Sequence, residues 1–372
     1  MTGITKREFV MADGRELIYF DDANSALSPE RKPDARHLDA RPNTAVMRQD
    51  PLTGDWISIA AARQNRVFLP PTDKDPLAPA TATNPSEIPD DYDVVVFENR
   101  SPSFGPALSE GYSDDELTSI GVGRALPSIG RCEVVCFSPQ STGSFADLTV
   151  SRARTVIEAW ADRTAALSAL PGVREVFPFE NRGEAIGVTL HHPHGQIYSY
   201  PYVTPRTQRL LDSIARFDGD LFESIIAFES ASDRVLIRGE HWIAFVPFAA
   251  RWPIEVHLLP LRHIPDFAAT TDAERDELSH IYLRLLRGMD ALYPTPTPYI
   301  AAWHQAPVAH QGQNSARDAI RLMLQITSPR RAADKLKYLA GSESAMGAWI
   351  GDILPEVAAA AIRSALERIV EP

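Results

Sequence analysis

The chain has 372 residues, 44% hydrophobic and 23% charged, which is ordinary for a globular protein with a sizeable core. Its 37 basic and 49 acidic side chains give a net charge of −12, which argues against a protein that binds nucleic acid or anionic lipid. No apolar run approaches the roughly 20 residues that cross a bilayer, and the amino terminus lacks a secretory apolar segment. We therefore expect a cytoplasmic protein. If it binds phosphate groups, we expect a few clustered cationic side chains to bind them.

The first half of the chain alternates short apolar runs with irregular segments. Two apolar stretches flank Asp13-Gly14 between Glu8 and Phe20 and predict a β-hairpin. Six prolines between Pro70 and Pro89 predict a long loop. The predicted strands of this half cover residues 56–60, 94–97, 134–137 and 196–200, and a helix is predicted over about 151–170.

The second half repeats this mixture of helices and strands. Apolar spacing predicts one helix from Arg206 to Phe228, and a capping box at Thr271 and Glu274 opens another. Further strands are predicted at residues 235–237, 243–246 and 254–259, and a last helix near Pro355. Because regular βαβ spacing and a glycine-rich phosphate loop are missing from the sequence, we expect an α+β fold with mainly antiparallel sheet.

The two cysteines, Cys132 and Cys136, lie in one predicted strand. Four residues of a strand span roughly 13 Å, so they cannot pair with each other. Buried thiols of a reducing compartment are expected.

Residues 191–201 read HHPHGQIYSYP and carry the chemistry. Strand alternation places His192, His194, Gln196, Tyr198 and Tyr200 on one face. A neutral imidazole can attack phosphorus, and a nearby backbone carbonyl that accepts from Nδ1 of His194 would leave the lone pair on Nε2. Gln196 can donate to a phosphoryl oxygen but cannot act as acid or base, so it would preserve a phospho-histidine for a second acceptor. The alternatives are core histidines, or a metal cluster of His191, His192 and His194 that lacks further ligands with suitable spacing.

This motif resembles the active-site motif of the galactose-1-phosphate uridylyltransferases, a branch of the histidine-triad superfamily. The resemblance implies two histidine-triad-like halves, at 46–205 and 206–372, after an amino-terminal extension at 1–45 that contains the hairpin. Other segments similar to the family are PLTGDW (51–56), FEN (97–99), VVCFSP (134–139), ENRG (180–183), VPFAARWPIE (246–255), WHQAP (303–307) and KYLAGSE (337–343).

By this resemblance His194 and Gln196 are the catalytic residues. The substrate-binding residues that it implies are Arg63, Arg66, Phe97, Asn99, Asn181, Thr189, His192, Lys337, Gly341 and Glu343. Phe97 and Asn99 would hold uridine, and Arg100 stands where members often carry an acidic ribose contact. The implied assembly is a homodimer with shared active sites, in which Arg63 and Arg66 reach across the interface.

The positions that hold metal in some members differ here. The usual zinc ligands correspond to Asp75, Ala78 and Ser141, so only His192 remains of that set and the resemblance implies no structural zinc. A second metal site would use two histidines at positions that we assign to Leu324 and Ile326, together with His304. We expect an enzyme that requires no cofactor and whose loop is held by prolines and packing.

The implied reaction exchanges UMP between UDP-glucose and galactose 1-phosphate through a uridylyl-histidine at His194. One alternative is a nucleotide-sugar or dinucleoside-polyphosphate phosphorylase, which would accept inorganic phosphate. The other is a nucleotide-sugar binding protein without catalysis, against which the intact pair His194 and Gln196 argues.

Overall fold

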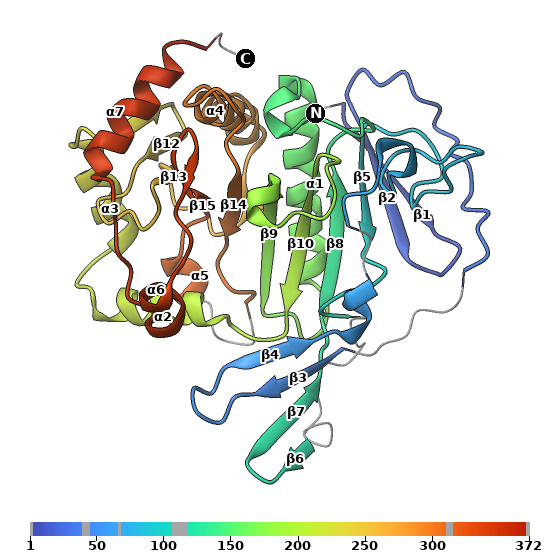
Figure 1. The fold of residues 1–372 in the computed structure, drawn as a ribbon, viewed down its shortest axis with the longest axis horizontal. Helices are drawn as coiled ribbons and strands as arrows, with labels where there is room; N and C mark the ends of the chain where they lie inside the picture. Colours follow the sequence, from blue (N-terminus) through green and yellow to red (C-terminus); the bar gives the residue numbers. More distant parts are fainter. Residues whose placement is uncertain (1–2, 39–44, 66–67, 106–117, 310–314, 370–372) are drawn as a thin grey trace.

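The computed structural model describes residues 3–38, 45–65, 68–105, 118–309 and 315–369 (Figure 1). Its main feature is an 11-stranded sheet in the order β1-β2-β5-β8-β10-β9-β14-β15-β13-β12-β11, whose neighbouring strands are all antiparallel. The strands are β1 (Thr5–Val10), β2 (Glu16–Asp21), β5 (Val94–Glu98), β8 (Arg131–Cys136), β9 (Glu175–Arg182), β10 (His194–Tyr200), β11 (Val235–Arg238), β12 (Trp242–Phe245), β13 (Ile254–Pro260), β14 (Tyr299–His304) and β15 (Met323–Ser328). Because β9 pairs with β14, both halves of the chain share this sheet.

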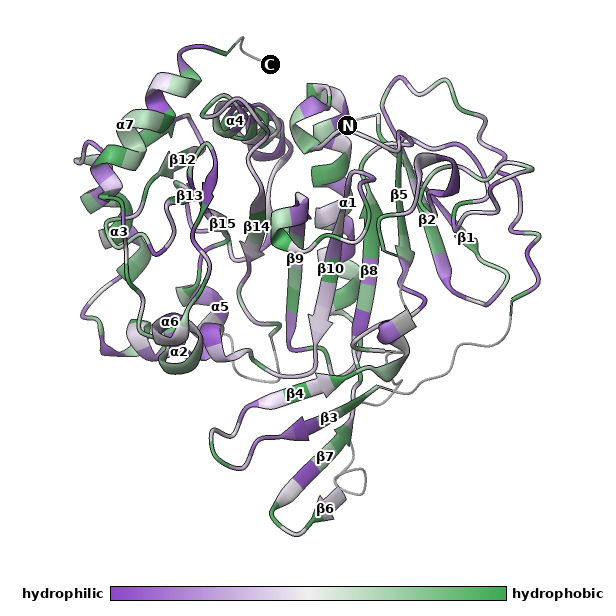
Figure 2. Ribbon diagram, viewed as in Figure 1, coloured by the Kyte–Doolittle hydropathy of each residue, from purple (hydrophilic) through white to green (hydrophobic). Residues whose placement is uncertain are grey.

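Helices pack against one face of the sheet and bury its apolar side chains. The large core cluster joins alternate residues of the strands to α1 (Val150–Ser168), α4 (Asp272–Asp290) and α7 (Pro355–Leu366). Figure 2 shows β5 as hydrophobic along nearly its whole length, as expected for a central strand buried on both faces. The remaining α-helices among the described residues are α2 (Pro205–Arg216), α3 (Leu221–Ser230), α5 (Ser315–Ala319) and α6 (Gly341–Met346).

Two smaller sheets lie outside this frame. The four-stranded one has the order β4-β3-β7-β6 and lies at the lower end of the molecule in Figure 1. Its strands are β3 (Val46–Gln49), β4 (Trp56–Ile59), β6 (Thr118–Ile120) and β7 (Gly123–Pro127), and the two-stranded sheet pairs β16 (Arg330–Ala332) with β17 (Lys335–Leu336).

The predicted fold class, α+β with mainly antiparallel sheet, is confirmed. The hairpin is also confirmed as β1 and β2, with Gly14 in its turn at φ 82°, and β2 pairs with β5. The hairpin therefore belongs to the same sheet as the HHPHGQ motif. Both cysteines are buried and unpaired, as predicted. No helix among the described residues is long and apolar enough to cross a membrane.

The prediction of one helix from Arg206 to Phe228 is wrong, because the segment forms two helices, α2 and α3. The chain leaves helical geometry at Phe217, and Gly219 has φ 107°. Asp220 then caps α3 by accepting a hydrogen bond from the Glu223 amide. The apolar spacing continues through this break, so periodicity alone did not reveal it.

A carboxyl group is buried at the centre of the sheet, on the face toward α4. Glu180 of β9 is only 4% exposed and accepts a hydrogen bond of 3.1 Å from the Tyr299 hydroxyl. Burial, opposed in part by the charge of Arg182, raises the pKa of Glu180 from 4.5 to about 8. The group is therefore largely protonated in the folded protein at neutral pH and ionised in the unfolded chain.

This difference predicts a pH-dependent stability. Because the pKa of Glu180 is higher in the folded protein than in the unfolded chain, its contribution to the free energy of unfolding is fully present below pH 4.5. This contribution is lost as the pH rises toward about 8. Glu180→Gln should remove the dependence and raise the melting temperature relative to wild type at pH 8 more than at pH 5. Glu184→Gln, at a side chain that is 66% exposed, is the control. Parallel melting curves for wild type and Glu180→Gln between pH 5 and 8 would contradict the prediction.

Candidate active site

The HHPHGQ motif opens strand β10, and its side chains alternate between two environments. From His194 to Tyr200 the even-numbered residues are half-buried and the odd-numbered residues are buried, as the sequence predicts. His192 lies before the strand, so the predicted alternation does not extend to it. Gly195 is required because a Cβ there would lie 2.9 Å from both the Phe179 carbonyl oxygen and Cζ of Phe137. Close approach of the neighbouring strand therefore explains this glycine.

The hydrogen bond at His194 determines its tautomer. Nδ1 of His194 lies 2.7 Å from the backbone carbonyl oxygen of His192. A carbonyl oxygen only accepts, so Nδ1 carries the proton and the lone pair of the neutral ring is on Nε2. The backbone contact that was predicted for a nucleophilic His194 is therefore present.

The His192 ring occupies a buried polar cluster behind the nucleophile. Its Nδ1 lies 2.6 Å from Oδ2 of Asp75, and its Nε2 lies 2.8 Å from the Ser138 carbonyl oxygen and 2.9 Å from the Tyr92 hydroxyl. The Tyr92 hydroxyl can also donate to the Leu77 carbonyl at 2.8 Å, so each polar group of this cluster has a hydrogen-bond partner. Although burial acts in the opposite direction, the hydrogen bond and charge of His192 lower the pKa of Asp75. Asp75 and His192 therefore form a buried hydrogen-bonded pair.

This cluster coincides with the positions where some family members would hold zinc. Asp75, Ser141 and His192 do come together, because Ser141 also hydrogen-bonds Asp75. Among the described residues, no group of three or more histidine, cysteine or acidic side chains could hold a metal ion. Asp75 and His192 bind each other directly, so this donor set does not fit a tetrahedral zinc. The Pro70–Pro89 loop was expected to be held by prolines and packing, but the Asp75–His192 pair also anchors it.

His194 lies between two cavities. One, of about 160 Å³, contains the predicted Phe97, Asn99, Thr189 and Gln196. The other, of about 140 Å³, contains the predicted Asn181. Oε1 of Gln196 is buried without a hydrogen-bond partner in the described structure, so this amide has capacity for a ligand. A substrate that spans both cavities would place its central atoms beside His194.

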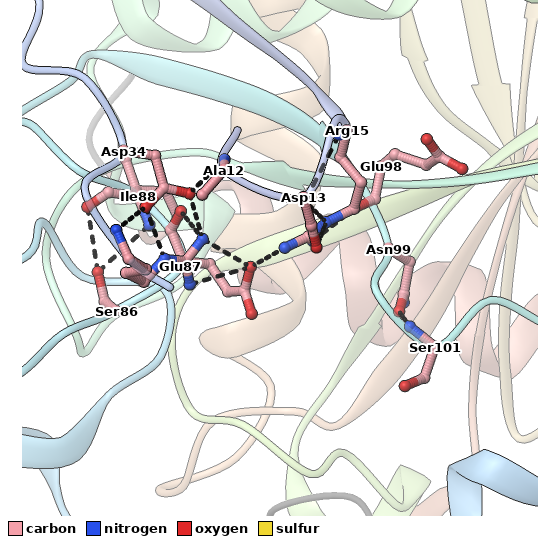
Figure 3. Close-up of polar contacts among 11 residues, drawn as sticks. Ala12, Asp13, Arg15, Asp34, Ser86, Glu87, Ile88, Glu98, Asn99 and Ser101 are labelled. Carbon is pink, nitrogen blue, oxygen red and sulfur yellow. Dashed lines mark hydrogen bonds and ion pairs between the residues drawn. The ribbon is translucent and has the colours of Figure 1, made fainter. Parts of the chain in front are cut away.

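The first cavity also contains Arg15 and Glu87, which the sequence analysis did not select. The Arg15 guanidinium is fully buried, lies 2.8 Å from Asp13 and 2.5 Å from Glu87, and donates to the Glu98 carbonyl at 2.9 Å (Figure 3). It therefore joins the hairpin turn, the proline-rich loop and the end of β5, directly before Asn99. Arg15 and Glu87 are 72 residues apart in the sequence, so their contact could not be predicted from local pattern. The Asp13-Gly14 turn signal predicted a hairpin next to Arg15 but no role for the arginine.

Four further predicted binding residues, Arg63, Lys337, Gly341 and Glu343, line neither of the cavities beside His194. Nη1 of Arg63 lies 3.5 Å from the Tyr198 hydroxyl of its own chain, and Arg66 lies outside the described residues. Lys337 is buried, lines a different cavity and lies 3.6 Å from the Glu343 carboxylate. Gly341 begins α6 and lines neither cavity beside His194. Among the residues that the structure describes, one chain therefore does not place Arg63, Lys337 or Gly341 in the cavities beside the nucleophile.

Comparison with known proteins decides the family. Residues 36–204 match the family Galactose-1-phosphate uridyl transferase, N-terminal domain, and residues 209–369 match its C-terminal domain. The chain belongs to the galactose-1-phosphate uridylyltransferase family. It is 45% identical over 328 residues to the galactose-1-phosphate uridylyltransferase of Streptomyces lividans, with 86% of each chain covered. The enzyme of that name from Thermotoga maritima is 31% identical over 320 residues, which cover 85% of this chain and 97% of the relative.

Solved structures agree with this assignment. A structure described as a uridylyltransferase has a TM-score of 0.76 and 28% identity, covering 88% of this chain and 100% of that chain. An ADP-glucose phosphorylase from Arabidopsis thaliana has a TM-score of 0.63 at 21% identity, which shows a shared fold alone.

The structure corrects one assignment made from this resemblance. Leu324 and Ile326 are fully buried in the core toward the helices, so they do not face His304. The side chains beside His304 come from Met323, its partner in the ladder, and Gln325, whose Oε1 lies 3.3 Å from Nε2 of His304. Strand alternation shifts the two corresponding positions by one residue. Neither carries a histidine, so this site also departs from the metal-binding pattern.

The Asp75–His192 pair yields a stability prediction. Asp75→Ala would leave the buried His192 ring without its hydrogen-bond partner and should lower the free energy of unfolding by about 1.5–3 kcal/mol. Asp73→Ala, at an exposed residue in the same loop, should have little effect. Urea unfolding measures both values. Equal stability of the two variants would show that the pair does not anchor the loop.

Proposed function

We propose that this enzyme transfers UMP between UDP-glucose and galactose 1-phosphate through a uridylyl group on His194. The observation that carries the proposal is the Nδ1-protonated His194 between two cavities. Membership in the family supports this choice of substrates, because both curated relatives above are named for galactose 1-phosphate.

In the first step, Nε2 of His194 attacks the α-phosphorus of UDP-glucose. A P–N bond forms while the P–O bond to glucose 1-phosphate breaks, and the leaving oxygen keeps the electron pair. The ring gains positive charge but retains its Nδ1 proton, and the His192 carbonyl stabilises that charge by accepting its hydrogen bond. In this proposal Gln196 donates to a phosphoryl oxygen, and the cavity lined by Asn181 receives the leaving group.

In the second step, a phosphate oxygen of galactose 1-phosphate attacks the same phosphorus. The P–N bond breaks, its electron pair returns to Nε2, and UDP-galactose forms. Gln196 has no ionisable group with which to activate water, which favours transfer over hydrolysis. Phe97, Asn99 and Thr189 lie in the cavity proposed for the nucleoside, with Arg15 and Glu87 in its wall.

The proposal includes a cytoplasmic homodimer that needs no metal. Lys337 and Glu343 lie apart from His194 within one chain, which supports binding of substrate by a second copy. The two buried free thiols fit a reducing compartment. The direct Asp75–His192 contact supports independence from zinc.

Intact-mass spectrometry tests the covalent step. Wild-type protein incubated with UDP-glucose should gain the mass of one uridylyl group, and His194→Gly should gain none because the attacking nitrogen is gone. His37→Gly, at an exposed residue that lines neither cavity, should still form the adduct.

Adding an acceptor distinguishes the alternatives. Discharge of the adduct by galactose 1-phosphate, with little discharge by inorganic phosphate, supports the transferase. Equal discharge by phosphate would identify a phosphorylase. Binding of UDP-glucose without an adduct would identify a binding protein.

A further inference from the structure

The two halves of the chain repeat one succession of elements on the shared sheet. In the first half two strands, β5 and β8, precede helix α1 and strands β9 and β10. In the second half β12 and β13 precede α4, β14 and β15 in the same order. The ladders also correspond, because the order β5-β8-β10-β9 matches the order β12-β13-β15-β14.

The strand register extends this correspondence to single residues. In the first half Gln196 pairs with Val134, which pairs with Phe97. In the second half Gln325 pairs with His257, which pairs with Phe245. The phenylalanine and the glutamine of the His194 site therefore recur at equivalent positions. Two residues before Gln325, Met323 takes the position of His194.

A cavity lies over this repeated surface. Its volume is about 410 Å³, compared with about 160 Å³ for the cavity that contains Phe97 and His194. Phe245, His257 and Met323 are among its lining residues, on the face of the sheet opposite α4. This volume lies within the ordinary range of about 300–1,000 Å³ for ligand sites.

Positive charge gathers at this cavity in a protein of net charge −12. Arg206, Arg209 and Arg251 all line it and are exposed. Within the described parts of the chain, no carboxylate lies within ion-pair distance of these three guanidinium groups. Loss of hydration at the cavity wall and then the like charge of Arg251 lower the pKa of Arg206, and the charge of Glu255 acts in the opposite direction. Arginines that gather without acidic partners favour a phosphate ligand.

The nearest buried carboxylate is already bound by its own neighbours. Oε1 of Glu255 lies 3.0 Å from Nε2 of His257 and 2.6 Å from Nε2 of Gln325, and Oε2 accepts from the Arg251 amide at 2.6 Å. Glu255 is 2% exposed, and its charge opposes the lowering of the Arg206 pKa only in part, because that pKa stays below its ordinary value. Gln325 therefore holds Glu255 and is not itself among the residues that line the cavity.

Aromatic side chains supply the other half of a recognition surface. Phe222, Phe245 and Trp349 line the cavity, and the Arg251 guanidinium lies 5.7 Å from the Trp349 ring centroid. A planar base can contact such rings while its phosphate reaches the arginines. We infer that this second-half cavity binds a nucleoside phosphate without reacting with it, because Met323 replaces the nucleophilic histidine.

Equilibrium dialysis with labelled UMP tests the inference on the full-length protein. The Arg206→Gln/Arg251→Gln variant should bind one equivalent of UMP per chain fewer than wild type. Its affinity for UMP at this site should fall by at least about tenfold. Arg209→Glu, a second route to the same loss, should weaken it similarly. Arg216→Gln, on the same helix but outside the cavity, should bind as wild type does.

The adduct at His194 separates this test from the proposed function. The arginine variants should still form the uridylyl adduct with UDP-glucose, so a lost UMP equivalent reports the second cavity alone. Unchanged UMP binding in both arginine variants would overturn the inference. Displacement of that UMP by inorganic phosphate at equal concentration would also overturn it, because the cavity would then recognise phosphate without the nucleoside.

Discussion

The hydrogen bond from Nδ1 of His194 to the His192 carbonyl is the interaction on which the site depends. Its geometry requires the backbone at His192 to be fixed, and the ring of the same residue supplies that constraint through Asp75, Ser138 and Tyr92. The Asp75 carboxylate from a loop, the Ser138 backbone carbonyl just after β8 and the Tyr92 hydroxyl just before β5 thus converge behind one imidazole. A residue predicted to bind substrate therefore has its ring directed into the protein. Its predicted contact with substrate stays a prediction.

Local signals in the sequence were sufficient for much of the fold. The hairpin at Asp13-Gly14, the capping box at Thr271 and the alternation along β10 each depend on neighbours only a few residues apart. The break between α2 and α3 was missed because apolar spacing continues across Gly219. A shift of one residue in the comparison with the family assigned the two positions beside His304 to Leu324 and Ile326, which lie on the opposite face of the strand.

The contacts that shape the site are long-range, and this is why the sequence did not reveal them. Asp75 and His192 are 117 residues apart, and Arg15 and Glu87 are 72 apart. The sequence identified Asp75 only as a residue at the position of an expected cysteine ligand. In the structure its carboxylate is hydrogen-bonded to the His192 ring. The resemblance correctly identified the family and the motif. The hairpin's contribution to the site, through Arg15, emerged only from the folded chain.

The ladder between β9 and β14 has a consequence for how the chain can be divided. Ile300 pairs with Asn181, and Ala302 with Phe179, so separation of the halves would expose two long unpaired strands at the middle of the sheet. The same cut would uncover the apolar contact between α1 and α4. Exposed strand edges beside apolar surface promote association between chains. Either half expressed alone would therefore tend to aggregate, and the two halves should unfold together as one cooperative unit.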